Sequence, residues 1–156
     1  MWHDFTIGDY AKHKFFDVPQ LGDRQFGLTL LETFPACAQK RWVPYYHFAI
    51  VRHGKDIGHL NFRVANSRII TEYDGHIGYR IFPTFRGFGY AAKACETLRP
   101  LLRLHKFSSV ILTCNPDNLA SRHTIENLGA SLLEIKEFKD VPRSMDRLKC
   151  RYQWVL

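Results

Sequence analysis

Arg86-Gly87-Phe88-Gly89-Tyr90-Ala91-Ala92 is the stretch that decides the fold. An apolar, strand-like run from His76 to Phe82 precedes it and is closed by Pro83. After it, apolar residues recur at helical spacing from about Tyr90 to about Leu104. The sequence therefore predicts a strand, a glycine loop and the N-terminus of a helix, in that order.

This loop has the chemistry of an anion site. Gly87 and Gly89 permit positive φ and let a ligand approach the backbone without meeting a Cβ. The first N–H groups of the helix lack intrahelical partners, and the helix dipole adds partial positive charge there. Arg86 adds a planar, charged fork that matches phosphate oxygens. We expect a phosphate or pyrophosphate here; the alternative is a plain glycine-containing turn.

The composition is that of a globular protein. The chain has 156 residues, with 46% hydrophobic and 14% aromatic residues, which suits a single domain over residues 1–156. The formal charge is +7, from 22 Lys and Arg against 15 Asp and Glu. This balance favours an anionic ligand or partner. The basic residues are scattered, which argues against nucleic acid.

Cysteine spacing and hydropathy indicate the compartment. Cys37, Cys95, Cys114 and Cys150 include no CxxC pair, so we expect neither a metal site nor a redox motif. Widely spaced cysteines suit a reducing compartment. The first residues lack the basic and apolar regions of a signal peptide, and no run approaches a membrane span. We expect a cytoplasmic protein with no membrane contact.

The first half of the chain is predicted to be antiparallel. Residues 26–34 are rich in β-forming residues, and alternation over residues 45–51 and 57–64, around the turn at 53–56, predicts a hairpin. Residues 65–74 form a mostly polar connection. Residues 1–25 show no lasting period, and we expect a short strand or helix that docks on a core spanning about residues 26–156.

The second half predicts a crossover and two late strands. Pro100 should kink or end the helix, and residues 108–114 read as a buried strand, which completes a right-handed βαβ unit. A second helix from Leu119 to Leu128 should be capped by Asn118 and stopped by Gly129. Strands at 132–138 and 148–156 should pair antiparallel.

Two motifs together resemble the GNAT N-acetyltransferase superfamily. The first is Arg86-Gly87-Phe88-Gly89-Tyr90-Ala91 after a central strand; the second runs from Cys114 through Asn118 and Ser121 to Gly129-Ala130. The resemblance covers residues 45–156 well and the first 25 poorly. It implies an α/β (α+β) fold with a mixed central sheet of about six to seven strands. The N-terminal half would be antiparallel, with the parallel βαβ unit at a cofactor cleft and helices on both faces.

The resemblance also implies acetyl-CoA as co-substrate and no metal. The central strand would splay from the next one, the pantetheine arm would pair with the strand's backbone, and the pyrophosphate would sit on the loop amides. The cofactor-binding residues implied are Ile81, Phe82, Arg86, Gly87, Phe88, Gly89, Tyr90, Ala91, Ala92, Asn115, Asn118 and Ser121.

The implied reaction is direct acetyl transfer to a primary amine of a small molecule or a protein N-terminus. His76 is the first choice for the base because histidine titrates near neutrality; Tyr79 and Glu72 are the alternatives. The N–H of Phe82 would stabilise the oxyanion. Many family members place a tyrosine on the second helix to protonate the thiolate, but this chain has Ile125 there, which leaves Ser121 or a water. Residues 26–47 and 65–75 would build the acceptor pocket.

Two other interpretations stay open at this level. Gly87 to Ala92 also fits the G-x-G-x-x-A pattern of dinucleotide enzymes, but the antiparallel first half and the missing acidic residue at the end of the next strand argue against it. A non-catalytic acyl-CoA-binding module or sensor is the second. Among acetyltransferases, the helix without tyrosine resembles the branch that acetylates ribosomal proteins. A homodimer is also left open.

Overall fold

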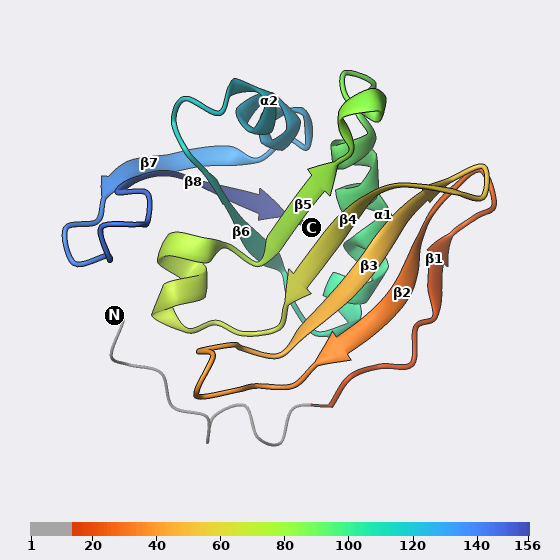
Figure 1. The fold of residues 1–156 in the computed structure, drawn as a ribbon, viewed down its shortest axis with the longest axis horizontal. Coiled ribbons are helices and arrows are strands. Elements are labelled where there is room, and N and C mark those ends of the chain that lie inside the picture. The colour runs from red at the N-terminus through yellow and green to blue at the C-terminus, as the bar shows by residue number, and fades with distance from the viewer. Residues whose placement is uncertain (1–13) are drawn as a thin grey trace.

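The computed structural model describes residues 14–156, and its strands form two sheets (Figure 1). The larger sheet has five antiparallel strands in the order β1-β2-β3-β4-β5. They span Gln20–Gly22, Phe26–Phe34, Tyr45–Arg52, Lys55–Arg63 and Ile77–Ile81. The predicted hairpin is therefore confirmed as β3 and β4.

The smaller sheet has three strands in the order β6-β8-β7, all antiparallel. They span Ser109–Cys114 (β6), Ser131–Glu137 (β7) and Leu148–Val155 (β8). The two late strands do pair, as predicted, but the last one enters between the other two. The described residues thus contain eight strands, more than the six to seven expected.

β5 and β6 lie side by side only where they begin. The N–H of His76, just before β5, donates to the carbonyl of Ile111 at 2.7 Å, and beyond this point no ladder joins the two strands. Figure 1 shows them diverging from there, β5 toward the glycine loop and β6 toward α2. The predicted splayed βαβ arrangement is thus present, with the sheet divided at the splay.

The helices are those that the sequence predicts, with one correction. α1 spans Tyr90–Leu104 and α2 spans Leu119–Asn127. Pro100 neither ends nor divides α1, which continues through it. Pro100 is exposed, so the carbonyl of Glu96 that loses its backbone donor faces solvent, where hydration can replace the bond. None of the described helices is long and apolar enough to cross a membrane.

The helices cover the small sheet unequally. Trp154 and Tyr152 share one face of β8; Arg99 of α1 lies over the Trp154 ring, and Glu126 of α2 accepts a hydrogen bond from Tyr152. The other face carries Arg151, which donates to the carbonyl of Thr71. Thr71 belongs to η2, a π-helical turn over Ile69–Asp74 that the sequence did not predict. Among the described residues, this short turn contacts the opposite face, where a helix was expected.

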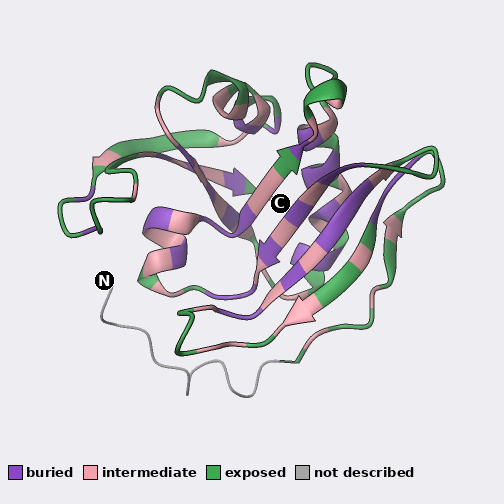
Figure 2. Ribbon diagram, viewed as in Figure 1, coloured by how far each residue is buried: buried purple, intermediate pink, exposed green. Residues whose placement is uncertain are grey.

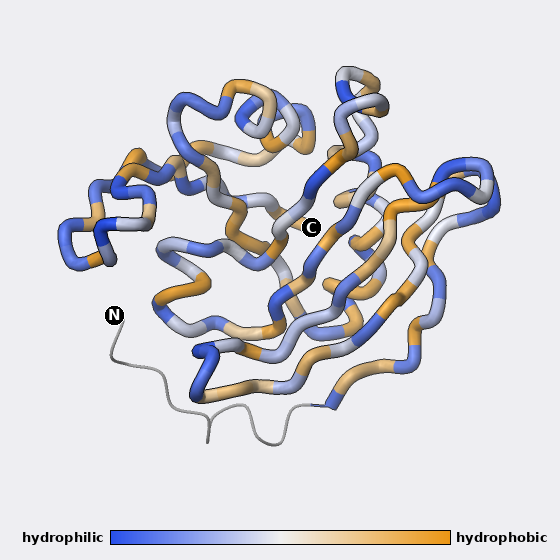
Figure 3. The backbone as a smooth tube through the Cα atoms, viewed as in Figure 1, coloured by the Kyte–Doolittle hydropathy of each residue, from blue (hydrophilic) through white to orange (hydrophobic). Residues whose placement is uncertain are grey.

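One continuous core joins the large sheet to α1. Leu98 and Leu102 of α1 are fully buried against Phe48 and Leu60 of the sheet, while the polar face of the helix is exposed (Figure 2). Hydrophilic residues gather in the turns, as at the β3–β4 hairpin tip (Figure 3). This packing fixes the N-terminus of α1 at the open end of β5.

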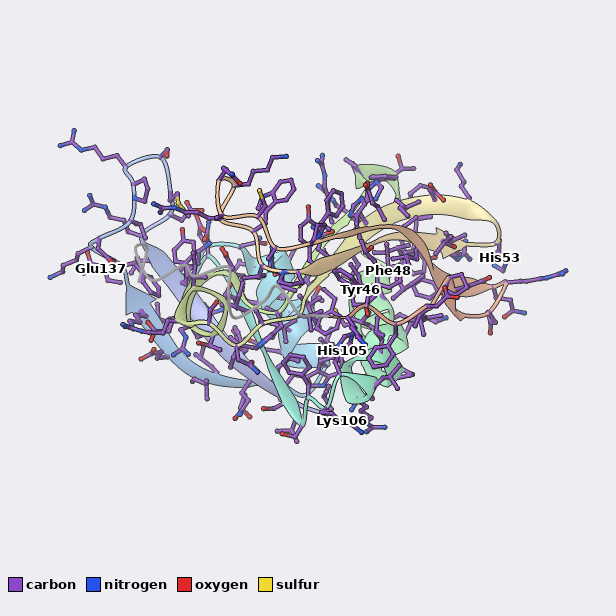
Figure 4. The ribbon with its side chains drawn as sticks, turned by 90° about the horizontal axis from the view of Figure 1, so that it is seen from below. Tyr46, Phe48, His53, His105, Lys106 and Glu137 are labelled. Carbon is purple, nitrogen blue, oxygen red and sulfur yellow. The ribbon has the colours of Figure 1, made fainter. Side chains whose placement is uncertain are left out.

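The chain before β2 also contacts this core. Tyr46 of β3 is buried, and its hydroxyl lies 2.7 Å from Nε2 of His105, at the end of α1 (Figure 4). The same hydroxyl accepts the N–H of Phe16 at 2.8 Å. β1 pairs with β2, so a short docked strand is present as expected between residues 14 and 25. The part of that expectation that concerns residues 1–13 lies outside the described residues.

Candidate active site

The glycine loop has the backbone conformation that its sequence predicts. Gly87 and Gly89 have φ of +88° and +75°, and Gly89 is the left-handed N-cap of α1. No side chain caps the helix, and a Cβ at either glycine would meet nothing within 4 Å. Phe88 is 68% exposed. The first amides of α1 therefore face open space, as an anion site requires.

The side chains around this loop leave the backbone as the binding surface. Tyr90 stacks on Phe26 with ring centroids 5.9 Å apart, and Ala91 is buried. Nε of Arg86 donates to the carbonyl of Ile81 at 2.8 Å, which holds the guanidinium beside the end of β5. A phosphate contact from Arg86 remains a prediction.

β5 has one hydrogen-bonded edge and one free edge. The N–H of Arg63 donates to the carbonyl of His76, and the N–H of Phe82 donates to the carbonyl of Ile57. The residues of this segment that bond to β4 are therefore the even-numbered ones. Bonded and non-bonded pairs alternate in an antiparallel ladder, so the amides of Tyr79 and Ile81 point toward the splay. The predicted oxyanion role of the Phe82 N–H is therefore wrong, because the carbonyl of Ile57 occupies it at 2.9 Å.

Tyr79 and Ser121 meet across the splay. The Tyr79 hydroxyl lies 2.9 Å from Oγ of Ser121, so β5 and α2 are joined by a pair of hydroxyl groups. Burial raises the pKa of Tyr79, and the hydrogen bond from Ser121 only partly opposes this. Tyr79 therefore stays protonated at neutral pH, which favours a role as proton donor over the role of base. Ile125, one helical turn after Ser121 on α2, is buried.

The other polar residues predicted on this wall have structural partners. Oδ1 of Asn118 accepts the N–H of Ser121 at 3.1 Å, so this side chain caps α2 and orients Ser121. Oδ1 of Asn115 accepts from Nζ of Lys149 at 2.8 Å. Cys114 ends β6 beside Ser121, and burial raises its pKa to about 11. Its thiol is therefore neutral and poorly suited to act as a nucleophile.

His76 is not placed to act as a base. It is buried, its Nδ1 accepts the N–H of Ile111 at 2.8 Å, and its Nε2 lies 2.9 Å from Oδ1 of Asn66. Burial lowers its pKa from 6.5 to about 4. Both ring nitrogens are occupied, so the imidazole holds the two strands together where they begin. This corrects the first choice made from the sequence.

Glu72 is also committed elsewhere. Its carboxylate forms ion pairs with Lys136 at 2.9 Å and with Arg68 at 3.3 Å. The hydrogen bond from Lys136 is the main reason that the pKa of Glu72 lies below its usual value. A carboxylate paired with two cations is a weak proton acceptor, which argues against Glu72 as the base.

A cavity of about 250 Å³ lies on the outer face of the large sheet, next to β5. Segments 41–45 and 69–74 and two residues of β4 build it; the lining residues are Arg41, Trp42, Val43, Tyr45, Asn61, Arg63, Ile69, Ile70 and Asp74. Most of them fall within the segments 26–47 and 65–75 expected to form the acceptor pocket. That this cavity receives the acceptor remains a proposal.

The sequence analysis missed two of the three charged residues that line this cavity, Arg63 and Asp74; the third is Arg41. Asp74 follows Tyr73 in the irregular connection, and Arg63 ends a strand in which alternate side chains are polar. If residue 78 had a Cβ atom, it would lie 3.2 Å from Nη2 of Arg63, so the guanidinium packs directly against Gly78 of β5. Alternation predicts that the Arg63 side chain points away from the core face, but nothing in the sequence showed that it is half-buried on the other face.

Comparison with known proteins agrees with this architecture. The family model described as an acetyltransferase (GNAT) domain matches residues 10–131. No curated protein sequence was found to match. RimL, a ribosomal L7/L12 alpha-N-protein acetyltransferase, superposes with a TM-score of 0.67 at 14% identity, over 94% of this chain and 99% of that one.

Two further structures were solved with acetyl-CoA. The microcin C7 self-immunity acetyltransferase MccE, bound to acetyl-CoA and AMP, has a TM-score of 0.59 at 18% identity over 72% of this chain. YncA of Salmonella typhimurium, a putative acetyltransferase with acetyl-CoA, has 0.57 at 18% over 72%. This chain spans 61% and 65% of those two proteins. Such identities establish a shared fold. With the match over residues 10–131, the chain belongs to the GNAT acetyltransferase family.

Proposed function

We propose that this protein is an acetyl-CoA-dependent N-acetyltransferase that transfers the acetyl group directly to a primary amine. The observation that carries the proposal is the free edge of β5. It diverges from β6, exposes the amides of Tyr79 and Ile81, and leads to the uncapped N-terminus of α1. An extended pantetheine arm fits such an edge, and a diphosphate fits the amides that follow Gly87 and Gly89.

The acetyl thioester supplies an activated carbonyl. The residues around it hold the reactants in position and donate protons. The amine attacks that carbonyl while the C–S bond breaks. Of the two protons that an ammonium loses, one goes to the medium and the other to the departing sulfur. The amides on the free edge of β5, Tyr79 and Ile81, replace Phe82 as donors to the carbonyl oxygen as its charge grows.

Ser121 is the group we assign to the departing sulfur. The Asn118 side chain accepts the N–H of Ser121, and Tyr79 of β5, on the other side of the splay, hydrogen-bonds the Ser121 hydroxyl. Because Tyr79 stays protonated, it can pass a proton through Ser121. In this way β5 supplies the phenol that the second helix lacks at Ile125. The neutral thiol of Cys114 supports direct transfer over an acyl-enzyme.

Calorimetry with acetyl-CoA, followed by a thiol-release assay with a panel of amines, tests the proposal. Micromolar binding and amine-dependent release of CoA would support it. Binding without release by any amine would favour the non-catalytic acyl-CoA module. Absence of binding would overturn both.

A further inference from the structure

The cavity beside β5 holds opposite charges on apolar walls. Arg63 and Asp74 both line it, together with the rings of Trp42 and Tyr45, which meet edge to face at 5.7 Å, and the buried side chain of Ile70. A volume of about 250 Å³ is below the ~300–1,000 Å³ typical of drug-sized ligands. The cavity therefore suits a small molecule with both a charged and an apolar part.

Arg63 is a half-buried cation with no carboxylate within 4.0 Å among the described residues. Its Nη1 donates to the backbone carbonyls of Asp74 at 3.3 Å and Gly75 at 3.1 Å. Among residues 14–156, none of the ion pairs within 4.0 Å involves Arg63. Burial lowers the pKa of Arg63, and the charge of Asp74 only partly opposes this, so a ligand carboxylate at the guanidinium would offset more of the cost of burying the charge. The fork also matches a carboxylate geometrically.

Asp74 provides the complementary charge. Within the described part of the chain, its carboxylate forms no ion pair within 4.0 Å, although it lines the same cavity. Burial raises the pKa of Asp74, and the charge of Arg63 opposes that rise. An ammonium group beside this carboxylate would satisfy it. Arg63 also lies against Gly78, the residue before Tyr79, so the cavity borders β5 on the face opposite the Tyr79 side chain.

We propose that the acceptor is a free α-amino acid with an apolar side chain, its carboxylate on Arg63, its ammonium beside Asp74 and its side chain against Trp42 and Tyr45. This inference rests on the proposed function and narrows it. A peptide N-terminus carries the ammonium group, but it has an amide at the position where Arg63 would bind a carboxylate. The cavity therefore discriminates a free amino acid from a protein N-terminus by charge.

The test compares the common L-amino acids with their carboxamides in the thiol-release assay, and identifies products by mass. We expect kcat/KM for apolar amino acids to exceed that for the matching amides by about 10- to 100-fold, as for a charge-assisted hydrogen bond. Arg63→Met should reduce this ratio to about one, and Arg63→Lys should restore part of it. Arg68→Gln, an exposed arginine outside the cavity, is the matched control and should leave the ratio unchanged.

Binding measurements keep the result decisive. Calorimetry with acetyl-CoA on every variant shows whether the cofactor site is intact. If the parent protein does not bind acetyl-CoA, the proposed function is contradicted as well. If the Arg63→Met variant fails to fold, Asp74→Asn takes its place. We expect this variant to bind the amino acid more weakly, as measured by calorimetry with CoA present. Amides accepted as well as acids, or no amino acid accepted while acetyl-CoA binds, would overturn this inference alone.

Discussion

His76 and Ile111 exchange two hydrogen bonds: the backbone N–H of His76 donates to the Ile111 carbonyl, and the Ile111 N–H donates to the His76 imidazole. A side chain thus replaces the backbone acceptor at the last position where β5 and β6 are joined. The strands separate beyond it, so this pair sets where the cofactor cleft begins.

His76→Ala should destabilise the protein without altering the pH profile of kcat. It leaves the buried N–H of Ile111 without its acceptor, which costs about 1–3 kcal/mol, and it adds a cavity next to Phe107. Urea unfolding at pH 7 measures the loss. His123→Ala, an exposed histidine on α2, is the control. A shifted acidic limb of the kcat profile would instead restore His76 as the base.

The same histidine makes stability depend on pH. Its pKa is about 4 in the folded protein and 6.5 in the unfolded chain, so the unfolded chain binds the extra proton first as the pH falls. The contribution is complete above pH 6.5 and is lost between pH 6.5 and 4, by about 3 kcal/mol. Unfolding free energies measured across this range should fall less steeply for His76→Ala than for the parent protein. Equal slopes would contradict the assignment.

Gly89→Val should weaken acetyl-CoA binding at least tenfold and leave the fold in place. Valine is strained at φ +75°, by about 1–2 kcal/mol, and its branched side chain would project where the diphosphate is expected. Calorimetry with acetyl-CoA gives the affinity. Gly129→Val is the matched control, because Gly129 also has open space and a positive φ, +81°, at the end of α2. If both variants bound alike, the loop would not be the diphosphate site.

Ser121→Ala should lower kcat about 10- to 100-fold while the affinity for acetyl-CoA changes little, because it removes a proton donor from the transition state. Tyr79→Phe should lower kcat less, and the double variant should match Ser121→Ala alone if the phenol acts through the serine. Steady-state kinetics and calorimetry separate the two quantities. Additive losses would show that the two hydroxyl groups act independently.

Pro100→Ala should stabilise the protein by about 1–2 kcal/mol. It restores a backbone donor inside α1, worth up to ~3 kcal/mol of helix propensity, and about 1 kcal/mol is lost because the unfolded chain becomes freer. The site is exposed, so no packing changes. Urea unfolding is the measurement, and an unchanged midpoint would mean that α1 already compensates for the missing donor.

The elements that repeat a clear pattern could be predicted from the sequence. Alternation located β3 and β4, and the glycine loop with its flanking runs located β5 and α1 almost to the residue. The turn η2 was missed because Ile69 and Ile70 form one apolar pair within a polar connection, too short to show a helical period. The prediction that Pro100 would end the helix was wrong because helix propensity alone does not show that the proline lies on the solvent-exposed side.

The roles of polar residues could be predicted only in part. Asn118 was recognised as a cap, and Ser121 lies where the motif implied. The sequence did not show that His76 and Glu72 have structural partners, because these partners, Ile111 and Lys136, lie 35 and 64 positions along the chain. Arg63 escaped notice for the same reason, since its burial depends on three distant segments. Spacing gives the face of a strand but not what covers that face.

The position of β8 has a consequence for how the protein is made. β6 bonds to β8 along its whole length, and the N–H of Leu156 donates to Ser108, so β6 has no ladder partner until this late strand emerges from the ribosome. α1 and the five-stranded sheet can assemble earlier. We therefore expect one wall of the cleft to mature only after β8 has been synthesised, so truncations that remove β8 should lower the folding yield.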